Sequence, residues 1–147
     1  MEQIEDMQSH DYLVSHLRQL LKQYEGQSPR MSLREQTKLM VRIQEATRNL
    51  GIAIGVRAGF SPKSAKARIL SYLQESANQV LDGLELAAIS GISEYARRVR
   101  EIRVEGLNIM AGPEGKDPKT GKDLLPSQYI LVSDRKAEAD GPFLPRK

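Results

Sequence analysis

The chain has 147 residues and a formal net charge of +3, and it contains no cysteine. This length suits one domain or one small domain with an extension, and the lack of cysteine excludes disulfides and thiolate metal sites. The acidic, polar start lacks the features of a signal peptide, and no apolar run reaches the roughly 20 residues that cross a bilayer, so we expect a soluble, cytoplasmic protein with no membrane partner.

An N-terminal helical region is predicted over residues 1–61. Its first helix follows from apolar residues that recur at helical spacing after Asp11, with Gly26 as the expected stop. These apolar residues are Leu13, Leu17, Leu20, Leu21 and Tyr24. The polar start, residues 1–8, has no strong pattern and is expected to fray.

A second helix is predicted to begin at Ser32 and to end at Gly51. Ser32 and Glu35 have the spacing of a capping box, in which each side chain accepts a hydrogen bond from the other residue's backbone N–H. The charged face of this helix is interpreted as solvated, with contact to nucleic acid or an acidic partner as the alternative. Its residues are Arg34, Lys38, Arg42, Glu45 and Arg48. The glycine-rich segment that follows, residues 51–60, predicts a short strand or a packed loop, and it lacks the Gly-Lys-Ser/Thr of a phosphate-binding loop.

The next helix is predicted to begin with Ser61 and Pro62 and to run to about Ser76. Serine is a favoured N-cap and proline a favoured first helical residue. One side of this helix is apolar and should be buried, and it is formed by Ala65, Ile69, Leu70, Tyr72 and Leu73. The basic residues that line its first turns are Lys63, Lys66 and Arg68.

A helix-turn-helix is predicted in residues 79–104. A brief strand and an Asp-Gly turn precede a short helix from Leu84 to Ser90. Gly91 supplies the residue that tolerates positive φ in the turn, and Ser93 is the expected N-cap of the following helix.

The helix at about 94–105 is the predicted recognition helix. At 100° per residue, its core side is formed by Ala96, Val99 and Ile102. Arg97 then holds the outer face, with Arg98 and Arg100 beside it. A basic residue in this place suits a helix that enters the major groove, because arginine pairs bidentately with guanine or binds phosphate.

Two predicted strands around a hydrophilic loop follow the recognition helix. The second strand, near residues 128–132, has the clearest strand pattern in the chain, and the loop at about 111–127 predicts a hairpin wing. The wing lysines that would meet phosphates are Lys116, Lys119 and Lys122. Residues 134–147 are predicted to be a flexible extension, with Phe143 and Leu144 as candidates for docking.

Residues 62–133 resemble the winged helix-turn-helix superfamily in the order of their predicted elements. The run GISEYARRVREIRVEGLNI, followed by LPSQYILVS, is similar to the small winged-helix module at the ends of some bacterial HNH-type and restriction endonucleases. The resemblance implies that Arg97 and Arg98 contact DNA, helped by Ser93 and Glu94. The loop here is longer than in that family, and the resemblance includes no nuclease motif.

Catalytic and metal-binding patterns are weak in this sequence. His10 and His16 are six residues apart, which fits neither a zinc pair on a helix nor an HNH motif, so we interpret them as structural or surface residues. The acidic residues of the long loop are too sparse for a calcium site. We therefore expect no enzyme activity, no metal and no cofactor.

The favoured hypothesis is a mainly α protein with a small β-hairpin wing that binds double-stranded DNA. The DNA-binding residues would be Ser93, Glu94, Arg97, Arg98, Arg100, Lys63, Lys66 and the three wing lysines. The N-terminal helices would form a homodimer that reads two half-sites. Such a protein would be a transcriptional regulator or the DNA-reading component of a phage or restriction system. The alternative is a protein-interaction adaptor whose winged helix is structural and whose N-terminal helices bind a larger enzyme.

Overall fold

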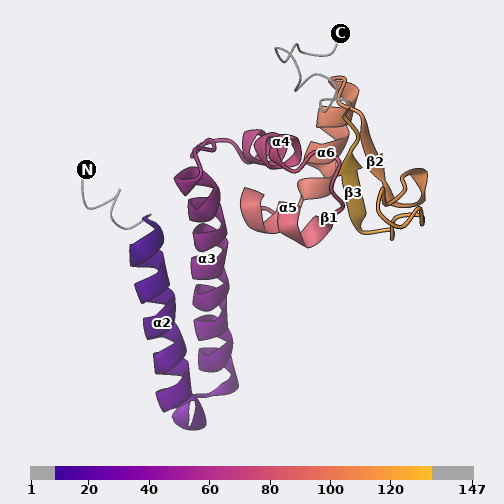
Figure 1. The fold of residues 1–147 in the computed structure, drawn as a ribbon. Helices are drawn as coiled ribbons and strands as arrows, with labels where there is room; N and C mark the ends of the chain where they lie inside the picture. Colours follow the sequence, from indigo (N-terminus) through magenta and orange to yellow (C-terminus); the bar gives the residue numbers. More distant parts are fainter. Residues whose placement is uncertain (1–8, 134–147) are drawn as a thin grey trace. The chain divides into compact units, whose positions relative to one another are not determined.

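The computed structural model describes residues 9–133, in two compact units that divide between Pro62 and Lys63. Unit 1 is a pair of helices, and unit 2 holds three helices and a small antiparallel sheet (Figure 1). The predicted fold class, mainly α with a small sheet after the helices, is confirmed. The expectations for residues 1–8 and 134–147, with Phe143 and Leu144, lie outside the described residues.

Unit 1 is a helical hairpin. Its elements are α2 (His10–Gln27), the 3₁₀ turn η1 (Ser28–Arg30) and α3 (Leu33–Arg57). The predicted capping box starts α3, because Glu35 N–H donates to Ser32 Oγ (3.1 Å) and Ser32 N–H donates to Glu35 Oε1 (3.0 Å). The hydrogen bond that the Ser32 backbone N–H donates to the Glu35 carboxylate lowers the pKa of this carboxyl. The buried cluster between the two helices is formed by Leu20, Leu39, Ile43 and Ala46.

The predicted end of this helix at Gly51, and the strand or loop predicted for residues 51–60, are wrong. Helix α3 continues to Arg57. A glycine inside a helix costs about 1 kcal/mol relative to alanine, and burial of the next turn, with Ala53 only 7% exposed, offsets that cost. The helix ends instead before Gly59, where φ is +98° and Phe60 N–H donates to the Gly55 carbonyl at 2.9 Å.

Unit 2 packs three helices against a three-stranded sheet. Its elements are α4 (Ala65–Glu75), β1 (Leu81–Asp82), α5 (Gly83–Ser90), α6 (Tyr95–Val104), β2 (Ile109–Ala111), η2 (Gly112–Glu114) and β3 (Gln128–Leu131). The strand order is β1-β3-β2, and both pairings are antiparallel. Every helix and every strand contributes to one core, formed by Ile69, Leu73, Leu81, Leu86, Val99, Ile102, Ile109 and Leu131.

Two predicted N-caps are wrong, Ser61 for α4 and Ser93 for α6. Helix α4 begins at Ala65 and not at Pro62, because the hydroxyl of Ser64 accepts from Ala67 N–H at 3.0 Å. Helix α6 follows Glu94, and no side chain caps it, so Ser93 is not its N-cap. Serine is a favoured cap only where the backbone beyond it is already helical, and here that condition is met one residue later.

The Asp-Gly turn predicted before the short helix is the N-terminus of α5. Asp82 Oδ1 accepts from Leu84 N–H, and Glu85 Oε2 accepts from Asp82 N–H, both at 2.8 Å. The hydroxyl of Tyr72 donates to Glu85 Oε1 at 2.6 Å. Burial, followed by this hydrogen bond, raises the pKa of Tyr72 to about 12. The α4 helix is thereby fastened to the start of α5.

Candidate nucleic-acid interface

A buried arginine holds the turn between α5 and α6 through hydrogen bonds to the end of α5. Gly91 has the left-handed conformation that the sequence predicts for it, with φ of +75°. The guanidinium of Arg68 donates from Nε to the Ile89 carbonyl at 3.0 Å and from Nη2 to the Ser90 carbonyl at 2.6 Å. These carbonyls belong to the last turn of α5, where acceptors lack helical partners and the helix dipole favours a cation.

Arg68 is a structural residue whose role the sequence analysis does not identify. It is 4% exposed, and this burial lowers the pKa of its guanidinium. Arg68 lies three residues after Ala65 and four before Tyr72, and both of these are predicted to be buried. Its position on the helix was the signal that could have found it.

The start of α6 is held by an aromatic contact instead of a cap. A Cβ atom on Gly83 would lie 2.5 Å from the hydroxyl oxygen of Tyr95, so only glycine lets this ring approach α5. The ring of Tyr95 also meets that of Tyr129 edge to face, at 6.3 Å between centroids. Helix α6 is therefore fixed to both α5 and β3.

The outer side of α6 is exposed and mixed in character. Val99 and Ile102, on the opposite side, are 2% and 1% exposed. The outer side forms a shallow depression of 410 Å³, lined by Arg97, Arg100, Glu101, Val104 and Glu105. Val104, the last residue of α6, is 88% exposed. This surface offers two cations, two carboxylates and an apolar group to a partner.

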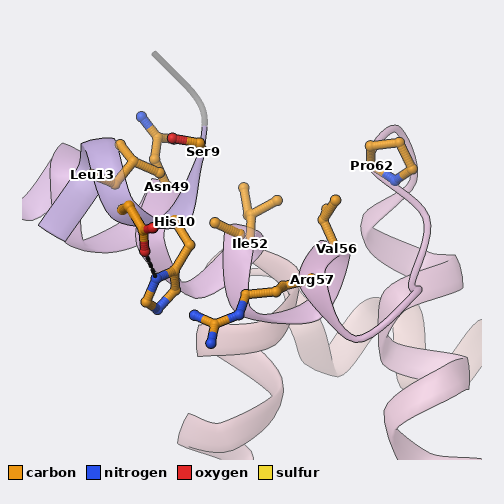
Figure 2. Close-up of a pocket in the computed structure, with 10 residues that line it drawn as sticks. Ser9, His10, Leu13, Asn49, Ile52, Val56, Arg57 and Pro62 are labelled. Carbon is orange, nitrogen blue, oxygen red and sulfur yellow. Dashed lines mark hydrogen bonds and ion pairs between the residues drawn. The ribbon is translucent and has the colours of Figure 1, made fainter. Parts of the chain in front are cut away.

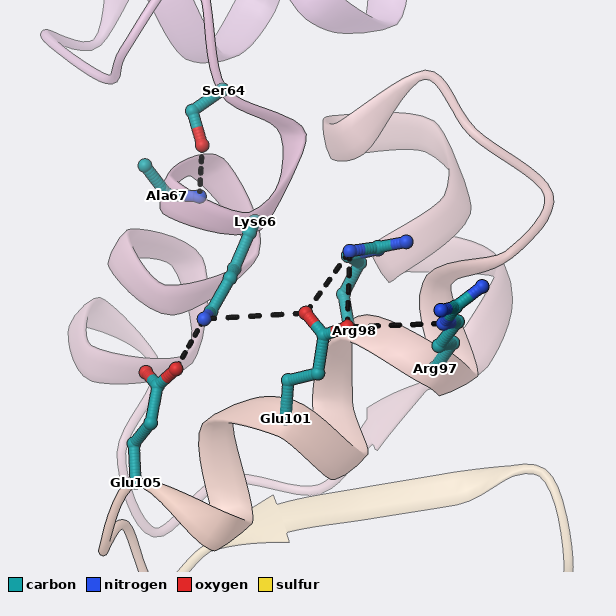
Figure 3. Close-up of polar contacts among 7 residues, drawn as sticks. All are labelled: Ser64, Lys66, Ala67, Arg97, Arg98, Glu101 and Glu105. Atoms are coloured by element: carbon teal, nitrogen blue, oxygen red, sulfur yellow. Dashed lines mark hydrogen bonds and ion pairs between the residues drawn. The ribbon is translucent and has the colours of Figure 1, made fainter.

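A network of charges links the outer side of α6 to α4 (Figure 3). Glu101 is at its centre. Arg98 Nη1 donates to both carboxylate oxygens of Glu101, at 3.0 and 3.1 Å. Arg97 Nε and Lys66 Nζ form longer ion pairs with the same carboxylate, at 3.8 and 4.0 Å. Lys66 also pairs with Glu105. One carboxylate therefore restrains three of the predicted DNA-binding side chains, although the Arg97 side chain remains 64% exposed. Among residues 9–133, Arg100 has no ion pair.

The loop between β2 and β3 is folded, whereas the sequence predicts only a hydrophilic wing. Lys116 and Asp123 form an antiparallel bridge, and their side chains pair at 3.1 Å. Leu124, at 3% exposure, anchors the loop to the core. Gly115 allows the close approach, because a Cβ there would lie 2.7 Å from Met110 Cβ. A leucine pair in an otherwise polar loop was the available signal of this anchoring.

The loop is also tied to the candidate recognition helix. Arg103 Nη2 on α6 contacts Glu114 Oε2 in η2 at 3.1 Å. Lys119 and Lys122 lie beyond the bridge and are exposed. The backbone N–H of Lys119 donates to Asp117 Oδ1 at 2.8 Å, which shapes the tip.

All ten predicted DNA-binding residues belong to unit 2, in three places. Ser93, Glu94, Arg97, Arg98 and Arg100 lie at or next to the first half of α6; Lys63 and Lys66 lie before and within α4; Lys116, Lys119 and Lys122 lie in the β2–β3 loop. The ion pairs bring Lys66 together with Arg97 and Arg98. The loop lysines are separate from this network among the described residues.

Unit 1 contains a second depression, of 820 Å³, where the start of α2 meets the last turns of α3 (Figure 2). It is lined by polar groups from Ser9, His10, Asn49 and Arg57 and by apolar residues such as Ile52. His10 Nδ1 lies 3.2 Å from Asp11 Oδ1, and the lining includes no further histidine or carboxylate. Residues 9–133 contain no group of three or more His, Cys, Asp or Glu placed to hold a metal ion.

No helix in the described part of the chain is long and apolar enough to cross a membrane.

Residues 66–132, which are most of unit 2, match the family model of the KpnI N-terminal domain. No curated protein and no solved structure matches the chain. The similarity is thus to a domain associated with a restriction endonuclease, and it points to a DNA-related component of a restriction system.

Proposed function

We propose that unit 2 is a winged helix-turn-helix module that binds double-stranded DNA in a restriction system. In this proposal α6 enters the major groove, and the β2–β3 loop lies along the phosphate backbone as the wing. The observation that carries the proposal is the outer side of α6, where Arg97 and Arg100 flank the exposed Val104. The start of this helix is held by the packing of Tyr95 against Gly83 and Tyr129.

The groups on α6 suit the edges of base pairs. A major groove about 12 Å wide admits one α-helix. Within it, arginine donates bidentately to guanine O6 and N7, and an aliphatic side chain packs against a thymine methyl group. Arg97 and Arg100 would supply the first kind of contact and Val104 the second. Lys119 and Lys122, beyond the bridge of the loop, would bind phosphates without reading sequence.

The family match favours a restriction system over a transcriptional regulator as the setting. We propose that this chain reads DNA and performs no chemistry itself, because the lining of the depression on α6 consists of basic, acidic and aliphatic side chains. The adaptor is the second candidate, and the acidic share of the outer side, Glu101 and Glu105, favours it, since these carboxylates oppose phosphate.

The first prediction concerns the two outward arginines. The double change Arg97→Ala and Arg100→Ala should weaken binding to a duplex at least tenfold, because each lost base or phosphate contact costs about 1–3 kcal/mol. Fluorescence anisotropy of a labelled duplex over a salt series would measure this loss, and the variant should also show a shallower dependence of affinity on salt.

A matched control removes the same charge elsewhere. Arg34→Ala with Arg42→Ala takes two exposed arginines from α3 in unit 1 and should change affinity about twofold or less, since only the general attraction falls. Circular dichroism would confirm that both variants are folded. Equal losses in the two double variants, or an unaltered protein that binds no duplex at about 50 mM salt, would reject the proposal and leave the adaptor.

A further inference from the structure

Helix α3 of unit 1 has a wider uncharged surface than α2 covers. At 100° per residue, its charged residues from Arg34 to Arg48 fall within an arc of about 140°. Leu39, Ile43 and Ala46 point to α2 and are buried. Between these two sectors lies a third one without charge, which runs the length of the helix. One row of its residues is spaced seven apart, and this row is Leu33, Met40, Thr47 and Ile54, with Gln36 and Gln44 beside it.

The residues of this third sector are open to solvent. Leu33 is 81% exposed, Met40 41% and Ile54 53%. In an antiparallel pair of right-handed helices, each residue has an angle around its own helix axis, measured from the buried side in the direction of the sequence. Residues of the two helices with similar angles of this kind lie on the same side of the pair. Leu21 of α2, which is 51% exposed, is displaced in that sense and therefore extends the same surface. We call Leu21, Leu33, Met40, Thr47 and Ile54 the apolar face of unit 1.

We propose that the apolar face binds a second copy of this chain, so that two hairpins form a four-helix bundle. This inference is independent of the proposed DNA binding. A two-fold interface brings a surface against itself, which requires that the surface carry no excess of one charge. On α3 the apolar face meets this requirement, because the charges from Arg34 to Arg48 lie in the other sector. On α2 the residues beside Leu21 include Arg18 and Glu25, which are of opposite sign and so add no excess of one charge.

The size of the face also suits a second copy. With 25 residues in α3, the side of the hairpin that carries the apolar face is about 37 Å long. Two helices packed 8–10 Å apart make it about 20 Å wide, which gives an area of roughly 700 Å². Stable interfaces bury about 800 Å² per partner, so two such faces make an interface of ordinary size. Gly51, between Thr47 and Ile54, leaves room for the partner's helix to approach closely.

The pattern of apolar residues agrees with a bundle. A helix that meets one neighbour needs a narrow stripe, whereas a helix in a four-helix bundle buries positions that face two neighbours. Helix α3 has both stripes, and the hairpin alone uses one of them. A pair of helices has a small core, and the buried cluster of unit 1 has four residues.

The test is the mass of the full chain in solution. One copy has a mass of 16.5 kDa, and light scattering or sedimentation at about 10–100 µM should give twice that value. The change Met40→Glu places a carboxylate opposite its own copy and should raise the dissociation constant at least about 100-fold, because facing like charges are strongly unfavourable. The sample should then run as a monomer at the same concentrations.

Val41→Glu is the matched control. Val41 is the next residue, it is 53% exposed, and it points to the other side of α3, so this variant should remain a dimer.

If Met40→Glu also loses helical signal, the thermal midpoint of the unaltered protein provides a second measurement, because a dimer melts higher at higher concentration. A monomeric mass for the unaltered chain at about 100 µM, a midpoint independent of concentration, or dissociation by both variants alike would overturn the proposal. Loss of DNA binding in the arginine variants with the dimer intact would concern the proposed function alone.

Discussion

Arg68 shows how one side chain can position a surface that it does not belong to. Its guanidinium occupies the end of α5 and satisfies the carbonyl groups of Ile89 and Ser90. A charge at this depth is tolerated because both acceptors belong to the negative end of a helix dipole. The turn at Gly91, and with it the direction of α6, depends on these two hydrogen bonds.

The second prediction therefore concerns Arg68→Met. This change keeps most of the side-chain volume and leaves two buried carbonyls without donors, so the free energy of unfolding should fall by about 2–4 kcal/mol. Urea unfolding followed by circular dichroism would measure it. Arg34→Met, at an exposed position of α3, is the control and should change the free energy of unfolding by about 0.5 kcal/mol or less. Similar losses in the two variants would mean that the buried contacts of Arg68 contribute little.

Among the elements, α5 and α6 meet at a contact that tolerates no side chain. The backbone of Gly83 lies against the ring of Tyr95, and the ring in turn rests on Tyr129. The position of α6 is consequently set by its first residue as well as by its buried side. Helix α6 lacks a side-chain cap, and this contact is what holds its start.

The third prediction is that Gly83→Ala destabilises unit 2. The added Cβ would lie 2.5 Å from the Tyr95 hydroxyl oxygen, and overpacking of this kind costs about 1–3 kcal/mol, visible as a lower thermal midpoint. Gly26→Ala is the control, because a Cβ there meets nothing within 4 Å and alanine favours the helix. Adding Tyr95→Phe to Gly83→Ala should recover part of the loss, and the contact would be unimportant if Gly83→Ala melted like the unaltered protein.

The elements also show which features the sequence could predict. The capping box of α3 and the left-handed Gly91 were predicted because each depends on residues within one turn of the chain. The continuation of α3 past Gly51 was missed, because packing of later residues outweighs the local preference of glycine. The burial of Arg68 and the anchoring by Leu124 depend on tertiary packing, and Arg68 donates to a carbonyl 21 residues away. The sequence offers only weak signals for them, which are the position of Arg68 on its helix and the leucine pair of the loop.

For the whole molecule, the candidate DNA-contacting groups and the broad uncharged face lie in different units. Unit 2 has the basic groups that would meet a duplex, whereas unit 1 has a broad uncharged face. If two copies associate through unit 1, two copies of unit 2 become available to one duplex, and the second contact is favoured by its high effective concentration. Affinity for paired half-sites would then exceed that for a single site.

The ion pairs of Glu101 have a consequence for selectivity. A carboxylate among the groups that face the duplex repels every phosphate equally. Arg97 and Arg98 leave their ion pairs with Glu101 only where their contacts with DNA are more favourable than those ion pairs. Contacts with the correct bases compensate for that release, whereas contacts with an arbitrary backbone compensate less. Glu101 would therefore lower the affinity for random DNA more than the affinity for a cognate site.

The fourth prediction tests this role through Glu101→Gln, which removes the charge and keeps the shape. Affinity for random duplexes should rise about tenfold, as expected for the loss of one unfavourable charge near phosphates. Glu114→Gln, which frees Arg103 at the edge of the loop, is the comparison and should have a smaller effect. An unchanged affinity for random DNA in Glu101→Gln would remove this role.

In a restriction system, where contact with the wrong sequence endangers the cell's own genome, such a residue would make weak binding to most DNA a protective property of the protein.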